Sequence, residues 1–157
     1  MEPIHVTTRA LESESMKELL SRHHVGRMAF SLHDHLSIVL ANYLFSDGWI
    51  YSRMEMGSDL VTLLHNRWVA FEVDEVDGLY DWRTVSINGS VQFLSNGPTA
   101  IEAREFKAAA DLIQSVVPSV LTPADPMPSR VQLFRIHVDQ MVGTEARSNA
   151  SEGLPPA

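Results

Sequence analysis

Apolar and polar residues alternate over short segments of this chain, which is the pattern of β-strands with one buried face. The alternation is longest in residues 80–94, where every second position from Val85 to Phe93 is apolar or glycine. Short turns such as Asp47-Gly48 separate most of the apolar segments, so antiparallel hairpins are expected to dominate. The five other segments with the β-branched or aromatic content of strands are residues 25–32, 36–45, 49–54, 67–76 and 131–142.

Helical spacing of apolar residues occurs in three places. A helix is expected at 14–24 after the N-cap Ser13, a second at 58–66 and a longer one at 100–117. The residues from 118 to 129 include four prolines and are expected to form an irregular connection.

Six strands with two or three helices favour an antiparallel all-β or α+β barrel over a doubly wound sheet. A chain of 157 residues has the size of one domain. Within it, we expect residues 1–12 to be an N-terminal arm and the small, polar residues 143–157 to be a flexible tail.

Charge and composition exclude several classes of partner. Twelve basic and twenty acidic residues give a net charge of −8, which disfavours nucleic acid because its binding relies on basic contacts. No apolar run approaches the ~20 residues that span a bilayer, and the first residues lack the features of a signal peptide. A cytoplasmic protein that binds neither nucleic acid nor membrane is therefore expected. The absence of cysteine excludes disulfides, thiolate metal sites and cysteine nucleophiles.

Residues 48–66 have the pattern of a strand, a turn and a short helix that together bind an anion. The strand ends near Arg53, Gly57 breaks the extended run, and Ser58 has the hydroxyl of an N-cap. The free N–H groups at a helix start attract an anion, and an arginine can hold a phosphate with two hydrogen bonds. Without further information, a surface arginine and an ordinary N-cap explain Arg53 and Ser58 about equally well.

The same stretch resembles the pyridoxamine 5′-phosphate oxidase-like superfamily, and more narrowly its flavin-binding, nitroimidazole-resistance-type branch. The similarity extends from about Ser15 to Leu94. It rests on Trp49-Ile-Tyr-Ser-Arg-Met-Glu-Met-Gly-Ser58, Leu63-Leu-His-Asn66, Val69-Ala-Phe-Glu-Val-Asp74, Val25-Gly-Arg-Met-Ala29, Asn42-Tyr43 and Trp82-Arg-Thr-Val-Ser-Ile-Asn-Gly89. The resemblance implies a six-stranded split β-barrel with a few peripheral helices, usually dimeric, with FMN at the dimer interface.

The resemblance also assigns roles to individual positions. In relatives, the flavin phosphate lies at positions matching Ser52, Arg53, Met54 and Ser58. The strand beside the flavin ring matches Leu40, Ala41 and Asn42, and the aromatic-Arg-Ser-Val segment of the family matches Trp82 to Val85, with Thr84 in place of serine. Each position also has a purely structural explanation: Leu40 suits a core strand and Trp82 suits the core.

Asp59 departs from the family pattern, in which a lysine usually stands two residues after the turn glycine. Two like unit charges ~4 Å apart repel by about 4 kcal/mol at an effective dielectric of 20. If Asp59 points outward as an acid in the first helical turn, FMN is still expected to bind, but more weakly. The other possibility is a member that has lost the phosphate or the flavin.

The seven histidines do not form a recognised metal motif, so we expect structural or solvent-exposed histidines and no metal site. Some split-barrel relatives bind haem, so one histidine ligand stays open as an alternative. The acids of residues 72–77 are expected to be a solvated strand end.

We therefore expect a homodimeric FMN-binding protein in which the flavin transfers hydride or electrons to an unknown small molecule. A reduced nicotinamide, NAD(P)H, is a donor by analogy only. The alternatives are a deazaflavin or a haem in place of FMN, a non-catalytic module that binds flavin or haem, and a member of the family that has lost its cofactor. No residue stands out as a catalytic acid or base.

Overall fold

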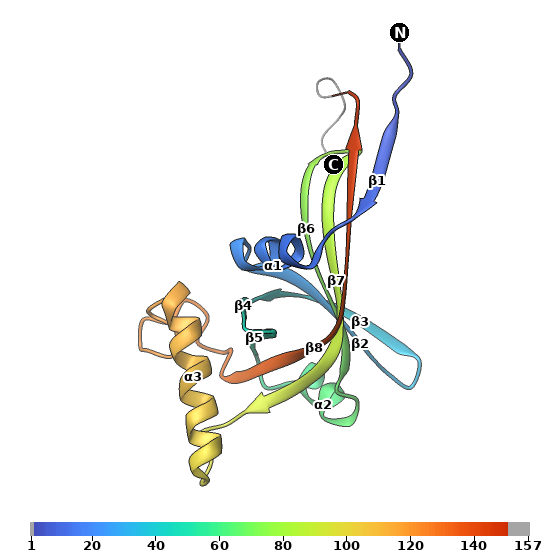
Figure 1. The fold of residues 1–157 in the computed structure, drawn as a ribbon. Coiled ribbons are helices and arrows are strands. Elements are labelled where there is room, and N and C mark those ends of the chain that lie inside the picture. Colours follow the sequence, from blue (N-terminus) through green and yellow to red (C-terminus); the bar gives the residue numbers. More distant parts are fainter. Residues whose placement is uncertain (1, 151–157) are drawn as a thin grey trace.

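One eight-stranded antiparallel sheet forms the body of the computed structural model, which describes residues 2–150. Its hydrogen-bonded order is β3-β2-β6-β7-β8-β5-β4, and β1 pairs with β8 outside this path. Within the described residues, the edge strands β3 and β4 are not hydrogen-bonded to each other, so the barrel stays open (Figure 1). The predicted class, a mostly β antiparallel split barrel, is confirmed. In chain order the strands are β1 (Val6–Ala10), β2 (Val25–Leu32), β3 (His35–Asn42), β4 (Leu44–Ser46), β5 (Trp49–Met54), β6 (Trp68–Gly78), β7 (Asp81–Leu94) and β8 (Gln132–Ser148).

The three longest strands serve two parts of the molecule. Their lower halves belong to the barrel, while above α1 they continue as an extension along which β1 runs (Figure 1). β8 changes partners along its length: Gln132 to His137 pair with β5, and Thr144 to Ser148 pair with β1. The barrel half of β8 is therefore the part that lies beside the strand expected to carry the anion site.

In the described part of the chain, three helices surround the barrel: α1 (Ser13–Arg22), α2 (Ser58–His65) and α3 (Ala100–Val116). α1 buries Leu19 and Leu20 in the main core. α3 starts with a capping box, in which the Thr99 hydroxyl accepts from the Glu102 amide at 3.1 Å and the Glu102 carboxylate accepts in return. None of the helices within residues 2–150 is long and apolar enough to cross a membrane.

Two hairpin turns fix the register of the barrel strands. Asp47 and Gly48 both have positive φ, 51° and 81°, as the expected two-residue turn requires. His33 and Asp34 form a similar turn between β2 and β3, with φ of 49° and 62°. Gly26 lies inside β2, where a Cβ would meet the ring of Phe71 at 2.5 Å, so the strand needs a glycine there.

The strand count of six was wrong, because two strands leave little trace in the hydrophobic pattern. All five residues of β1 are exposed, and it is held by backbone pairing with β8, not by a buried face. The expected strand at 36–45 is divided into β3 and β4 at Tyr43, whose hydroxyl donates to the carbonyl of Leu20 at 2.7 Å.

The chain ends differ from the expected arm and tail. Residues 6–10 of the arm form β1, and residues 143–148 of the tail complete β8. The remainder of the tail, residues 151–157, lies outside the described residues. The N-caps also differ, since Glu12 precedes α1 and Gly57 precedes α2, in place of Ser13 and Ser58.

Candidate functional site

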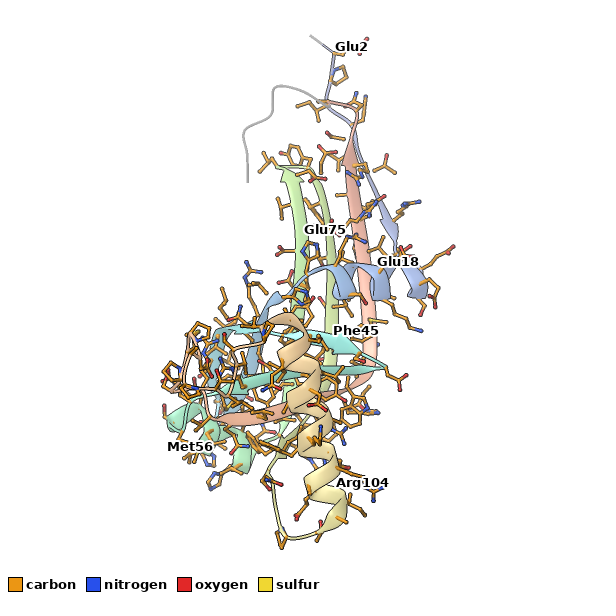
Figure 2. All side chains as sticks on the ribbon, turned by 90° about the vertical axis from the view of Figure 1, so that its left-hand side faces the viewer. Glu2, Glu18, Phe45, Met56, Glu75 and Arg104 are labelled. Carbon is orange, nitrogen blue, oxygen red and sulfur yellow. The ribbon has the colours of Figure 1, made fainter. Side chains whose placement is uncertain are left out.

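A cavity of about 320 Å³ lies where β3, the end of β5 and the start of α2 meet. Arg130 and Phe134, before and within β8, complete its wall. Side chains near Met56, on this wall, are crowded at the lower end of the barrel (Figure 2). Six of the ten predicted site residues line this cavity: Leu40, Ala41, Arg53, Met54, Ser58 and Asp59.

The N-terminus of α2 opens onto the cavity without a side-chain cap. Gly57 is the N-cap residue, and no side chain accepts from the first turn. The first intrahelical bond runs from the Val61 amide to the Gly57 carbonyl at 3.2 Å. The amides of Ser58 and Asp59 therefore have no acceptor within the described residues, and both residues line the cavity.

Arg53 is already paired in this structure. Its two terminal nitrogens donate to the two carboxylate oxygens of Asp125 at 2.6 and 2.7 Å, and one of them also donates to the Arg130 carbonyl at 3.1 Å. The Arg53 and Asp125 side chains are only 10% and 4% exposed. A phosphate contact from Arg53 stays a prediction, and the phosphate would have to share this guanidinium with the Asp125 carboxylate or displace it.

The Asp125 carboxylate accepts hydrogen bonds from several donors, in the way that a bound anion would. Besides the Arg53 fork, its carboxylate accepts from the amides of Leu121 and Met127, each at 2.9 Å. The hydrogen bonds from Arg53 and, after them, from the two amides hold the pKa of Asp125 well below its usual range, against the effect of burial. The carboxylate thus fastens the proline-rich segment to the barrel over the whole physiological pH range.

Arg130 is the cation that sequence reasoning missed. One terminal nitrogen donates to the Asn42 side-chain oxygen at 3.0 Å, which is a neutral partner. Within residues 2–150 no carboxylate lies within ion-pair distance of this guanidinium. Arg130 therefore offers the cavity an uncompensated positive charge with further donors.

The register between two distant strands could have indicated Arg130. β5 pairs with β8 so that Met54 lies opposite Gln132. Arg130, two residues before Gln132, is thereby carried past the end of β5 toward Met56 and the start of α2. No motif marks the residue, because the contact depends on pairing across almost eighty positions of sequence.

Two carboxylates oppose an anion at the same place. Asp59 lies on the cavity wall as an exposed residue of the first turn of α2, and Glu55 lies on the same wall. Glu55 accepts a hydrogen bond from the Ser129 hydroxyl at 2.8 Å. The cavity therefore combines unpaired amides and one guanidinium that has no acidic partner within the described residues with two acids, so the charge that a ligand meets depends on which of these groups face it.

Asn42 and Ser52 lie next to the cavity and not in its wall. The Ser52 hydroxyl donates to the Asn42 carbonyl at 2.6 Å and is buried. Asn42 itself is exposed at the end of β3, where its side chain receives Arg130. These two residues position the arginine and the strand edge.

Trp82 and Thr84 lie in the extension, away from the cavity. Thr84 pairs with Asp74 of β6 and with Thr144 of β8. The label of Glu75, the neighbour of Asp74 on β6, shows the position of this region in Figure 2. Neither Trp82 nor Thr84 lines the cavity. Within one protomer they are not brought together with the other eight predicted residues.

The histidines and acids form no metal centre in the part of the chain from residue 2 to 150, where no three His, Asp or Glu side chains are grouped to hold an ion. The acids of β6 are partly paired: Glu75 with Arg22, and Glu72 and Asp74 with Arg27. Burial and the neighbouring Asp74 raise the pKa of Glu72.

Comparison with known proteins identifies relatives of this chain. A family model described as pyridoxamine 5′-phosphate oxidase matches residues 12–145. No curated protein matches closely enough to count as a relative.

Solved structures share the fold at low sequence identity. An FAD-binding protein from Mesorhizobium loti is 22% identical with a TM-score of 0.72, over 91% of this chain and 99% of that one. A protein from Bacteroides thetaiotaomicron, provisionally described as a 5-nitroimidazole antibiotic resistance protein, is 16% identical with a TM-score of 0.73, over 94% of both chains. An FAD and haem binding protein from Mycobacterium smegmatis is 14% identical with a TM-score of 0.64, over 93% of this chain and 74% of that one.

Proposed function

We propose that this chain, which belongs to the pyridoxamine 5′-phosphate oxidase family, binds FMN with its phosphate in the cavity at the start of α2. The observation that carries the proposal is the set of donors there that have no carboxylate partner within the described residues. The uncapped amides of Ser58 and Asp59 and the guanidinium of Arg130 all line the same cavity. An anion satisfies all three, and a helix start with a nearby arginine is a favourable place for a phosphate.

The flavin ring fits the exposed edge of the barrel. A cavity of about 320 Å³ is at the low end for ligand sites, so it holds the phosphate and part of the chain that carries it. From Leu40 in the cavity wall, a stripe of apolar residues continues along β3: Leu36, Ile38 and Leu40 are 80%, 70% and 58% exposed. Such a stripe on an edge strand needs a cover, and a flat aromatic ring provides one.

We propose that a second copy of the chain covers the same face and completes the site. The stripe on β3 continues as a groove that Phe30, Trp68 and Val69 also line. Trp82 and Thr84 could then approach the flavin only from the partner, because they lie far from the cavity of their own protomer. Sedimentation equilibrium tests the dimer, and a chain that remains monomeric at micromolar concentration contradicts it.

When bound, the flavin supplies hydride or electron transfer, which no side chain of the cavity offers. The chain's own residues bind the phosphate, orient the ring against the backbone of residues 40–41, and keep water from the apolar face. A small-molecule substrate, with NAD(P)H as donor, follows by analogy with flavoproteins in general. The location proposed is the cytoplasm.

Riboflavin gives the direct test, because it is FMN without the phosphate. Quenching of flavin fluorescence is expected to show tight FMN binding and at least tenfold weaker riboflavin binding, since two to three charge-assisted hydrogen bonds are lost. Equal affinities would place the binding energy on the ring and contradict the phosphate site. No binding of either flavin would reject the function.

Neutralising Asp59 is expected to strengthen FMN binding about fivefold. The Asp59→Asn variant removes a carboxylate from the wall of the phosphate cavity, and an exposed charge contributes about 1 kcal/mol. Riboflavin affinity should not change. The matched control is Asp111→Asn on the exposed face of α3, where Asp111 pairs with Lys107. Equal FMN affinity of the wild type and Asp59→Asn would show that Asp59 does not face the phosphate.

The second candidate is a member of the family that binds no flavin. Two observations favour it: the carboxylates of Glu55 and Asp59 in the cavity wall, and the Asp125 carboxylate that occupies Arg53. The flavin titration separates the two candidates. Oxidation of NAD(P)H by FMN-loaded protein then separates an enzyme from a carrier.

A further inference from the structure

A second cavity, of about 300 Å³, shares Arg53 and Arg130 with the first and is otherwise lined by different residues. Its barrel side includes Tyr43, Leu44 and Tyr51. Its outer wall is the end of α3 and the segment that loops back beside it in Figure 1. The apolar residues of that wall are Ile113, Val116, Val117, Val120, Pro126 and Met127.

The outer wall is held in place by specific bonds. Asp125 ties it to Arg53 and to the amides of Leu121 and Met127. The Gln114 side chain donates to the carbonyl of Val120 at 2.9 Å, which joins the segment to α3. A cavity with a fastened wall costs a ligand little in ordering entropy, so it is preorganised for binding.

Among the polar residues that line this space, His24 and Tyr51 offer a hydrogen-bond acceptor to a ligand. His24 Nδ1 lies 3.1 Å from the carbonyl of Tyr43, and since a carbonyl can only accept, Nδ1 carries the proton. In the neutral ring, Nε2 is then an acceptor. Within residues 2–150 the Tyr51 hydroxyl makes no hydrogen bond, although Tyr51 is largely buried and lines the cavity. Both groups can accept a hydrogen bond from a ligand.

Size and charge define the class of ligand. An apolar cavity of ~150 Å³ holds a benzene molecule, so one of about 300 Å³ has room for two fused rings. Asp125 neutralises Arg53, and the rest of the wall is mostly apolar, so the charge that remains at this space is that of Arg130, which also lines the phosphate cavity. A charged ligand would lose its hydration there without full compensation.

We propose that the second cavity binds a small uncharged molecule with one or two aromatic rings and one hydroxyl or N–H group, which donates to His24 or Tyr51. This site goes beyond the flavin function and does not require it. The rings pack against the aliphatic residues of the outer wall and against Tyr43 and Tyr51. The ligand reaches the protein from solution as a separate molecule from the flavin.

Isothermal titration of the full chain with 2-naphthol tests the proposal, with 2-naphthoate as the charged probe of similar size. We expect a Kd of about 10–500 µM for 2-naphthol, as its few atoms allow, and at least fivefold weaker binding of 2-naphthoate. Tighter binding of 2-naphthoate, or no binding of 2-naphthol, overturns the proposal.

Two substitutions locate the site. Val120→Trp fills the buried side of the cavity, and Met127→Trp fills it from a partly exposed position that is easier to accommodate. Each is expected to weaken 2-naphthol binding more than tenfold and to leave FMN affinity unchanged. Val61→Trp, at an exposed position of α2 outside this cavity, is the control and should not alter 2-naphthol affinity. If Val120→Trp does not fold by circular dichroism, Met127→Trp decides, and unchanged 2-naphthol affinity in a folded variant contradicts the site.

Discussion

The Arg130→Ala variant is expected to bind FMN roughly 30-fold more weakly than the wild type, a loss of about 2 kcal/mol. Arg130 lines the phosphate cavity, and within residues 2–150 no carboxylate neutralises it. A hydrogen bond between two charged groups is about twice as strong as one between neutral groups. Titration of FMN fluorescence measures the loss.

Three controls give this result its meaning. Arg104→Ala removes the same charge from the exposed face of α3, where Arg104 donates to the Ala100 carbonyl of its own helix, and should change FMN affinity less than twofold. Arg130→Lys keeps the charge and should lose only part of the affinity. Riboflavin affinity should be equal in Arg130→Ala and the wild type. A similar loss for riboflavin would mean that Arg130 supports the fold of the site and does not hold the phosphate.

Arg53→Ala is expected to lower the melting temperature on the order of 10 °C. The substitution leaves the largely buried Asp125 carboxylate with two amide donors and no counter-charge. Residues 118–129 should loosen first, since this ion pair fastens them to β5. Thermal unfolding followed by circular dichroism gives the melting temperature, and hydrogen exchange locates the loosened segment. An unchanged melting temperature, with FMN binding lost, would instead assign Arg53 to the phosphate.

The pH dependence of the stability shows how much of the stabilisation by Asp125 comes from its negative charge and how much from the shape of its side chain. Because its pKa is lower in the folded protein than in the unfolded chain, its stabilisation is complete above about pH 4 and is lost as the pH falls further. Asp125→Asn should therefore be less stable than the wild type at pH 7, with a difference that shrinks below about pH 4. A difference that stays constant from pH 7 to pH 3 would contradict the ion pair.

Local chemistry made much of the barrel predictable. The strands at 25–32 and 49–54 were expected with their observed bounds, because each is short, apolar and bounded by a turn. The Asp47-Gly48 hairpin also followed from residue type, since both residues need positive φ. β1 could not be predicted in this way, because an exposed strand that is held by backbone bonds leaves no hydrophobic period.

In the candidate site too, the residues brought together by local sequence could be predicted, and those placed by long-range strand pairing could not. Ser58 and Asp59 come from one continuous stretch with Arg53, so a local pattern brought them together in one cavity. Arg130 reaches that cavity from just before β8, where the pairing of β5 with β8 places it. Asp125 reaches Arg53 from the proline-rich segment. The pairing also explains why an arginine expected to be free was found bound to an acid of the same chain.

A crystal structure of the protein grown with excess FMN tests the central claim most directly. We expect the phosphate at the start of α2, with oxygens within hydrogen-bond distance of the Ser58 and Asp59 amides and of Arg130, and with the Arg53–Asp125 pair intact. A phosphate elsewhere, or a cavity closed by the Asp59 carboxylate with FMN absent, would contradict it.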